Sequence, residues 1–440
     1  MPLVIVGISV LVLLFLMTKL KINGFVALLV VAVAVGLVEG IPLADIPGIL
    51  ADGVGGQLDD TLLVIGLGAM IGRVMGDAGA AQRIAMKMVE KVGLKGVQVA
   101  MVITAMLVGV TMFYEVAFVI IVPVAFTLVR ATKSNLLWVG LPMSITLSTM
   151  HSFLPPHPGP VAVAGTYEAS VGLTLAYGLL IAVPAGALIA LVWPRLSFVR
   201  KMDPQIPAGL VSDKLFDDDE MPSLWTSLAV ALLPVVLIAG AAIFEMTAPE
   251  SPAIGFVQFI GSAPIALLIT LLIACYVFGP MIGRTLDDVG KSAVDSAKPM
   301  AIILMVIGAG GAFKEILTEA GIADYIAELT STWNISPIIL AWLIAVILRI
   351  ALGSATVAVV TAAGIAAPLV AGSGISPELM VLATSCGSIA FSHVNDPGFW
   401  MFKEYFGLSV TDALKTRTTY TTTLAILGLG GVLLLSTFIH

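Results

Sequence analysis

The chain has 440 residues, of which 59% are hydrophobic and only 11% are charged, whereas about 25% of the residues in a typical soluble domain are charged. This composition excludes an ordinary soluble protein and predicts an all-α polytopic membrane protein, in contact with membrane lipid and not with nucleic acid. The net charge of −7 says little more, because orientation in a membrane depends on where Lys and Arg lie.

The first apolar run has no basic residue ahead of it and no small-residue cleavage site after it, so we expect a retained helix rather than a signal peptide. Ten segments approach the ~20 apolar residues needed to cross about 30 Å of hydrocarbon. Segments 96–130 and 337–371 are expected to enter and return as helical hairpins. The expected crossings are 2–19, 23–40, 61–76, 134–150, 170–193, 223–245, 257–280, 299–313, 377–391 and 419–438.

Basic residues are concentrated in alternate loops, and ten crossings place every basic loop on one side. Because cytoplasmic loops carry an excess of Lys and Arg, we expect a multi-pass protein of the cytoplasmic (inner) membrane with both termini outside. The long polar stretch 194–222 is then a cytoplasmic linker. Residues 77–92 form an amphipathic pattern, with Arg83 and Lys87 opposite Ile84, which indicates an elbow along the membrane surface rather than a lipid sensor.

The sequence repeats itself at an offset of 242 residues, at which 64–79 align without a gap on 306–321 and His151 falls on His393. We therefore expect a first transmembrane repeat over 1–193 and a second over 223–440. Each repeat has five crossings and one hairpin, and an odd number of crossings inverts the second repeat relative to the first. Inverted repeats are typical of secondary transporters, whose substrate sites lie near the middle of the membrane.

Polar residues at membrane depth gather at four places, the hairpin tips 109–118 and 351–360 and the helix breaks 150–160 and 391–400. Irregular backbone is tolerated at that depth only where it is buried in protein or lines a cavity. These four places are therefore the expected site. The tips include Thr111 and Tyr114 in the first hairpin and Gly353 and Ala355 in the second.

Two carboxyl groups lie in these segments, Glu115 at the first tip and Asp396 at the second break. A charge at the membrane centre costs about 2.5–3.5 kcal/mol on insertion scales unless it is protonated or paired. Each is thus a candidate proton carrier, together with the neighbouring His393. The alternatives are structural: Glu115 bonds backbone amides at the tip, and Asp396 caps a turn before Pro397. Arg349 either attracts a substrate carboxylate or snorkels to the surface, and we expect snorkelling.

Hydroxyl groups are the second class of candidate. Ser354 and Thr356 flank the second tip, where the unpaired amides of a helix N-terminus suit an anion, although a plain tight turn also explains the pattern. Serines one helical turn apart run toward each break and either line a polyhydroxy ligand or pack helices together. His151 and His393 are each expected to bind substrate, relay protons or fix the broken backbone. The two serine pairs are Ser144 with Ser148 and Ser388 with Ser392.

Four segments resemble the gluconate permease family: FYEVAFVIIVP at 113–123, HSFLPPHPGPVAVAG at 151–165, GSATVA at 353–358 and HVNDPGFWMFKEYFGLSV at 393–410. The similarity spans essentially the whole chain. Members of this family are proton-coupled symporters for gluconate and related sugar acids, and some relatives carry D-serine or other small hydroxy acids. The resemblance implies the ion transporter superfamily, with inverted repeats, a homodimeric scaffold and a substrate domain that moves as an elevator.

The resemblance also implies the site residues and leads us to expect a proton-coupled importer of gluconate or a related sugar acid. It places Ser354, Thr356, His393, Asn395 and Asp396 in one half of the site and Glu115, His151 and Ser152 in the other. Tyr114 stands where a second phenylalanine is expected, which leaves the preferred acid open. With only two cysteines and no metal-ligand spacing, we expect no cofactor and no metal. The alternatives are a carrier of D-serine or another hydroxy acid, sodium coupling, an intramembrane enzyme or a passive channel.

Overall fold

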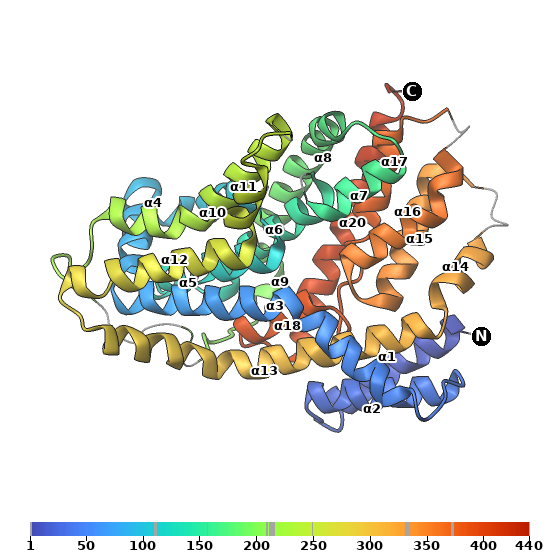
Figure 1. The fold of residues 1–440 in the computed structure, drawn as a ribbon, viewed down its shortest axis with the longest axis horizontal. Helices are drawn as coiled ribbons and strands as arrows, with labels where there is room; N and C mark the ends of the chain where they lie inside the picture. Colours follow the sequence, from blue (N-terminus) through green and yellow to red (C-terminus); the bar gives the residue numbers. More distant parts are fainter. Residues whose placement is uncertain are drawn as a thin grey trace.

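Helices make up all the regular structure that the computed structural model describes, which confirms the all-α prediction (Figure 1). The described residues are 2–109, 112–155, 157–207, 210, 216–248, 250–330, 335–370 and 374–439.

The first half begins with two short apolar helices and continues with a long one. α3 meets the first part of α4 at a bend of 73°, and α4 itself breaks at Gly93, whose φ is +67°, a conformation that glycine adopts at little cost. The helices are α1 (Pro2–Thr18), α2 (Gly24–Val38), α3 (Ile46–Asp77), α4 (Ala80–Gly109), α5 (Tyr114–Thr132), α6 (Leu136–Phe153), α7 (Pro158–Thr166), α8 (Val171–Val192), η1 (Trp193–Arg195) and α9 (Ser197–Arg200).

The second half repeats much of this succession of helices at close to the offset seen in the sequence. α13 lies where that offset from α3 predicts it, and the pair α15 and α16 corresponds in the same way to the end of α4 and α5. Its helices are α10 (Leu224–Thr247), α11 (Ile254–Gly261), α12 (Ala263–Val277), η2 (Pro280–Ile282), α13 (Leu286–Glu319), α14 (Ile322–Thr330), α15 (Pro337–Leu352), α16 (Ala355–Val370), α17 (Pro377–Gly387), α18 (Pro397–Tyr405), α19 (Val410–Ala413), η3 (Leu414–Thr418) and α20 (Thr419–Leu435).

The corresponding helices α3 and α13 form the main contact between the halves and run antiparallel. Gly53 of α3 lies against Gly311, whereas Leu58 lies against Gly308, so residue numbers rise along α3 as they fall along α13. A Cβ atom on Gly53 would lie 2.6 Å from the Gly311 carbonyl oxygen, so small residues are what allow the two backbones to approach. α2 packs on α13, and α12 packs on α3. In each half, therefore, a short apolar helix packs against the long helix of the other half.

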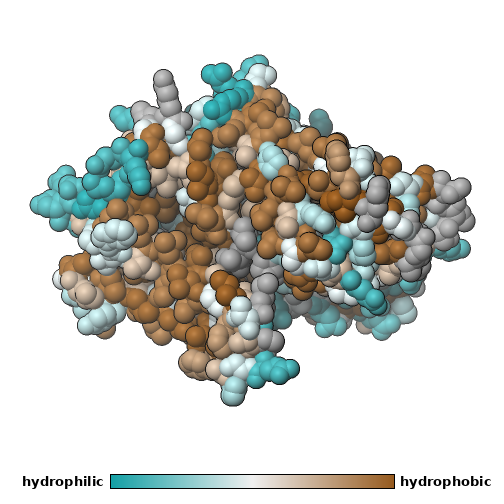
Figure 2. Space-filling view, turned by 90° about the horizontal axis from the view of Figure 1, so that it is seen from above, coloured by the Kyte–Doolittle hydropathy of each residue, from teal (hydrophilic) through white to brown (hydrophobic). Residues whose placement is uncertain are grey.

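The outer surface is broadly apolar, as contact with a bilayer requires. Figure 2 shows hydrophobic residues across the middle of one face and hydrophilic residues gathered toward its edges. By length and composition, six helices among the described residues can cross a membrane, or seven if the bent pair of α3 and α4 counts as one span. The ten expected crossings are therefore not matched one for one, because two of them, 2–19 and 23–40, fall on apolar helices of only 10–17 residues, and 377–391 falls on α17, which has 11 residues.

Two helix pairs meet at short turns and two helices are interrupted by proline-containing breaks. The end of α4 packs on α5, and α15 packs on α16. α6 ends at Phe153 before α7 begins at Pro158, and α17 ends at Gly387 before α18 begins at Pro397. Proline favours the first turn of a helix because its missing N–H has no intrahelical partner there. Residues at or next to these four interruptions line one cavity in the interior, the candidate site.

Candidate functional site

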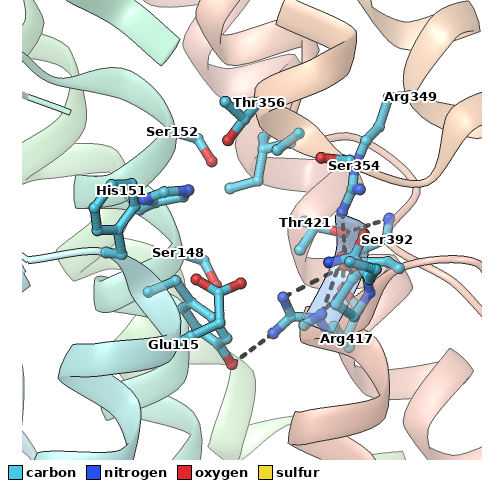
Figure 3. A pocket seen from close by; sticks show the side chains of 18 residues that line it. Glu115, Ser148, His151, Ser152, Arg349, Ser354, Thr356, Ser392, Arg417 and Thr421 are labelled. Atoms are coloured by element: carbon cyan, nitrogen blue, oxygen red, sulfur yellow. Dashed lines mark hydrogen bonds and ion pairs between the residues drawn. The ribbon is translucent and has the colours of Figure 1, made fainter. Parts of the chain in front are cut away.

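A polar cavity of about 180 Å³ lies between the two halves of the chain. Figure 3 shows Glu115, Ser148, His151 and Ser152 on one side of it and Arg349, Ser354, Ser392, Arg417 and Thr421 on the other. Concave sites with a small number of convergent polar groups are where small molecules usually bind. The lining residues are Gln57, Phe113, Tyr114, Glu115, Ser148, His151, Ser152, Arg349, Ser354, Ala355, Thr356, Ile389, Ser392, Asp396, Pro397, Gly398, Arg417 and Thr421.

Each hairpin directs the N-terminus of a helix at the cavity. α5 begins at Tyr114 with Glu115 in its first turn, and α16 begins at Ala355 after Ser354. The free amides of such a first turn carry partial positive charge and attract anions. Gly353 makes the second turn possible, because its φ is +75° and a Cβ there would collide with the Asn395 carbonyl oxygen. Thr111 of the first tip lies outside the described residues.

Asp396 is held between two buried arginines. Arg349 Nη2 donates to Asp396 Oδ2 at 2.6 Å, and Arg417 Nη2 lies 3.6 Å from the same oxygen. Ser392 also donates to this oxygen, while the other carboxylate oxygen accepts the Gly398 N–H at 3.1 Å. The carboxylate thus caps α18 and neutralises one guanidinium at the same time.

Arg349 does not snorkel to the surface, so that expectation is wrong. Its side chain is only 3% exposed and lines the cavity. Burial of the guanidinium is tolerable because a buried carboxylate lies beside it, and removing either partner of such a pair is costly. Its Nε and Nη1 atoms have no hydrogen-bond partner among the described residues, which leaves two donors for an anion.

Arg417 also lines the cavity, although it lies outside the four polar segments predicted from the sequence. It falls in a one-turn π-helix, Leu414–Thr418, a distortion that is frequent at functional sites. Its Nε donates to Ser392 Oγ at 2.7 Å, and its Nη1 donates to the hydroxyls of Tyr114 at 2.7 Å and Tyr420 at 3.0 Å. The guanidinium also lies 4.7 Å from the centre of the Tyr114 ring. The available signal was the hydroxyl-rich stretch TRTTYTTT at 416–423, which is unusual at the start of an apolar helix.

The charges that line the cavity balance only if Glu115 is ionised. Two guanidinium groups face the Asp396 carboxylate, and Glu115 makes no ion pair within the described part of the chain. Protonation of Glu115 therefore leaves one positive charge in excess, whereas ionisation leaves none. A buried excess of charge is unfavourable in a medium of low dielectric constant unless a counter-ion enters. The net charge of the cavity lining therefore depends on whether Glu115 is ionised.

His151, Ser148 and Ser152 come from the end of α6 and face the cavity (Figure 3). His151 Nδ1 has no hydrogen-bond partner among the described residues, and the ring stacks edge-on against His157 at 5.0 Å. His157 instead contacts the backbone: its Nε2 lies 2.7 Å from the Gly109 carbonyl oxygen at the end of α4. It therefore fastens the first hairpin.

His393 and Asn395 do not line the cavity. His393 Nε2 lies 3.1 Å from the Ile350 carbonyl oxygen, and Asn395 Nδ2 donates to the carbonyls of Ile350 and Ala351. They satisfy carbonyl groups at the end of α15 that a helix leaves unpaired. His393 thus fastens the second hairpin as His157 fastens the first, although the repeat aligns His393 with His151. Gln57, Ile389 and Thr421 line the cavity without having been predicted.

A metal site is not found: the described residues contain no group of three or more His, Cys, Asp or Glu side chains that could hold an ion. Most of the polar groups that line the cavity are cations, carboxylates and hydroxyls. Such groups suit a small organic anion that carries several hydroxyls.

Comparison with known proteins gives matches over the full length. The family model described as "GntP family permease" matches residues 1–438. The "High-affinity gluconate transporter" of Escherichia coli K12 is 48% identical over 99% of both chains, and the "Gnt-II system L-idonate transporter" of the same organism is 43% identical over 100% of both. The "Gluconate permease" of Bacillus subtilis 168 is 42% identical over 99% of both. Among solved structures, the Alcanivorax borkumensis YdaH transporter matches 94% of this chain and 98% of its own with 16% identity and a TM-score of 0.48.

Proposed function

Because this chain belongs to the GntP family of permeases and is a multi-pass membrane transporter rather than an enzyme, we propose that it imports gluconate or a closely related sugar acid together with a proton. The observation that carries this proposal is a cavity that combines two guanidinium groups, a carboxyl group with no ion pair among the described residues, and a wall of hydroxyls. L-Idonate is the nearest competing substrate, since a relative of 43% identity is named for it.

The substrate carboxylate binds beside Arg349. Arg349 has two donors without a partner among the described residues and lines the cavity together with Ser354, which precedes α16, and charge-assisted bonds to a carboxylate are the stronger ones. The substrate hydroxyls bond the side chains of Ser148 and Ser152 from the first half and of Ser354 and Thr356 from the second. His151 contributes its unpartnered nitrogen to this wall.

Glu115 carries the proton, and Asp396 holds the two arginines in place. A proton on Asp396 would have to displace the Arg349 hydrogen bond of 2.6 Å, whereas a proton on Glu115 breaks no ion pair. With Glu115 protonated, the cavity has one excess positive charge and accepts a monoanion. Loss of that proton to the cytoplasm removes the excess charge and favours release of the substrate.

One proton carried with one monoanion makes each transport cycle electroneutral. The membrane potential, worth about 2.3 kcal/mol per charge and 100 mV, then adds no driving force, and accumulation follows the pH gradient at about tenfold, or 1.4 kcal/mol, per pH unit. A net charge of zero also lowers the cost of moving the loaded site through the hydrocarbon region.

Alternating access by an inverted repeat fits the same geometry. The antiparallel course of α3 and α13 supports inversion of the second half, and the cavity lies where the halves meet, as in other repeat-built transporters. We extend the proposal to an elevator movement of the hairpins in a homodimer of the inner membrane, with both termini outside.

Uptake of labelled gluconate into proteoliposomes tests the proposal. Wild-type protein is expected to accumulate gluconate when the outside is more acidic, with no change when a potassium–valinomycin potential is applied. Glu115→Gln is expected to exchange labelled for unlabelled gluconate but to lose uphill uptake. Glu245→Gln, at an exposed carboxyl group, is the matched control and should behave as wild type.

Uphill uptake by Glu115→Gln at the wild-type rate would refute the assignment of the proton. Competition by L-idonate and D-serine in the same assay settles the substrate class, and stronger competition by D-serine than by unlabelled gluconate would refute the sugar-acid assignment. Uptake driven by sodium without a pH gradient would refute proton coupling.

A further inference from the structure

A groove of about 680 Å³ lies on the surface between the first part of α4, the end of α5 and the linker. None of its lining residues lines the transport cavity. It is therefore a separate feature that the transport function does not explain. The lining residues are Gln82, Arg83, Met86, Lys87, Val89, Glu90, Thr127, Arg130, Ala131, Lys133, Phe216 and Asp218.

The groove carries an excess of positive charge. Arg83 is committed to the linker, with Asp218 at 2.6 Å and the Pro222 carbonyl oxygen at 2.9 Å, and Lys87 pairs with Glu90 at 2.6 Å. Among the described lining residues, the cations are Arg83, Lys87, Arg130 and Lys133, and the carboxylates are Glu90 and Asp218. Lys133 is exposed and forms no ion pair with any other described residue.

Apolar side chains share the groove with these cations. Met86 is 40% exposed, and Val89 and Phe216 lie on the same lining. Lys133 caps the end of α5, a helix apolar enough to cross a membrane. The groove therefore lies where an apolar span ends, which is the depth of the lipid headgroups.

We propose that this groove binds the headgroup and upper acyl chains of an anionic phospholipid. A phosphodiester supplies the negative charge that the four cations attract, and the acyl chains cover Met86, Val89 and Phe216. Basic pockets beside membrane helices recognise anionic headgroups in this way. A soluble phosphate would satisfy the cations but would leave the apolar part of the groove in water.

Native mass spectrometry of the delipidated protein in a neutral detergent tests the proposal, with phosphatidylglycerol as the probe. The double variant Lys87→Gln/Lys133→Gln is expected to bind it about 25-fold more weakly, at about fivefold for each lysine near the surface. The matched control is Lys19→Gln/Lys291→Gln, at two exposed lysines outside the groove, and it should stay within about twofold of wild type on the same scale.

Phosphatidylcholine and glycerol 1-phosphate separate the possible sources of the interaction. Both are expected to bind far more weakly than phosphatidylglycerol. Equal binding of phosphatidylcholine would show that charge is not recognised, and equal binding of glycerol 1-phosphate would make the groove a soluble-anion site. Either result, or an equal loss of binding in both double variants, overturns the proposal.

Discussion

Replacing Tyr114 with phenylalanine removes one hydroxyl from the network that positions Arg417. That hydroxyl accepts from Arg417 Nη1 at 2.7 Å and lies 3.0 Å from Ser144 Oγ. Because Tyr114 belongs to the first hairpin and Arg417 to the far end of the chain, the bond joins the two halves across the cavity. The substitution keeps the ring, and with it the contact at 4.7 Å between ring and guanidinium.

The expected loss of affinity depends on which hydrogen bonds of Arg417 remain in the variant. A hydrogen bond to a charged group contributes about 1.5–3 kcal/mol. Arg417 Nη1 keeps the Tyr420 hydroxyl at 3.0 Å, and Nε keeps Ser392 at 2.7 Å, so we expect the lower end of that range. A loss of about 1.5 kcal/mol corresponds to an affinity for gluconate about tenfold weaker.

Equilibrium binding of labelled gluconate to the purified variant measures this change. Tyr405→Phe is the matched control, because its buried hydroxyl bonds the Met300 sulfur at 3.1 Å and does not line the cavity. Tyr405→Phe should leave the affinity within about twofold of wild type. Unchanged affinity in Tyr114→Phe, or an equal loss in both variants, would show that the hydroxyl does not position Arg417 for the substrate.

Two further predictions concern stability. Asp396→Asn leaves two arginines buried without their carboxylate, and we expect a loss of about 3–5 kcal/mol, measured as a lower melting temperature; a melting temperature equal to wild type would mean that the pair is dispensable. Gly353→Ala places a Cβ against the Asn395 carbonyl oxygen at a φ of +75°, and we expect a loss of stability of at least about 1 kcal/mol. The control is Gly364→Ala, which has open space around it and should not destabilise the protein. Equal melting temperatures for the two variants would contradict the role of Gly353 in the turn.

Local features of the sequence singled out several residues that line the candidate cavity. Irregular, polar segments inside an apolar chain have to be enclosed by protein, and this alone singled out Glu115, Ser354 and Asp396, which the fold brings to one cavity. The offset found in the sequence reappears in the bounds of α3 and α13, because helix bounds follow the local sequence. Composition and motifs also identified the family.

The roles of the long polar side chains depended on contacts that sequence distance hides. Arg349 was expected at the surface, but Asp396, 47 positions away, makes its burial tolerable. For His393 the sequence left substrate binding, proton relay and fixing of the backbone open, and its Nε2 lies 3.1 Å from the Ile350 carbonyl oxygen.

By itself, the sequence determined the membrane class, the family and the interrupted helices, because each depends on hydrophobicity and on residues that are neighbours along the chain. Only the tertiary structure decided which charges are paired and which remain free. Whether a buried guanidinium or carboxyl group is neutralised depends on its neighbours within a few ångströms. Those neighbours can be far away in sequence: Arg417 and Tyr114, which share a hydrogen bond, are 303 positions apart.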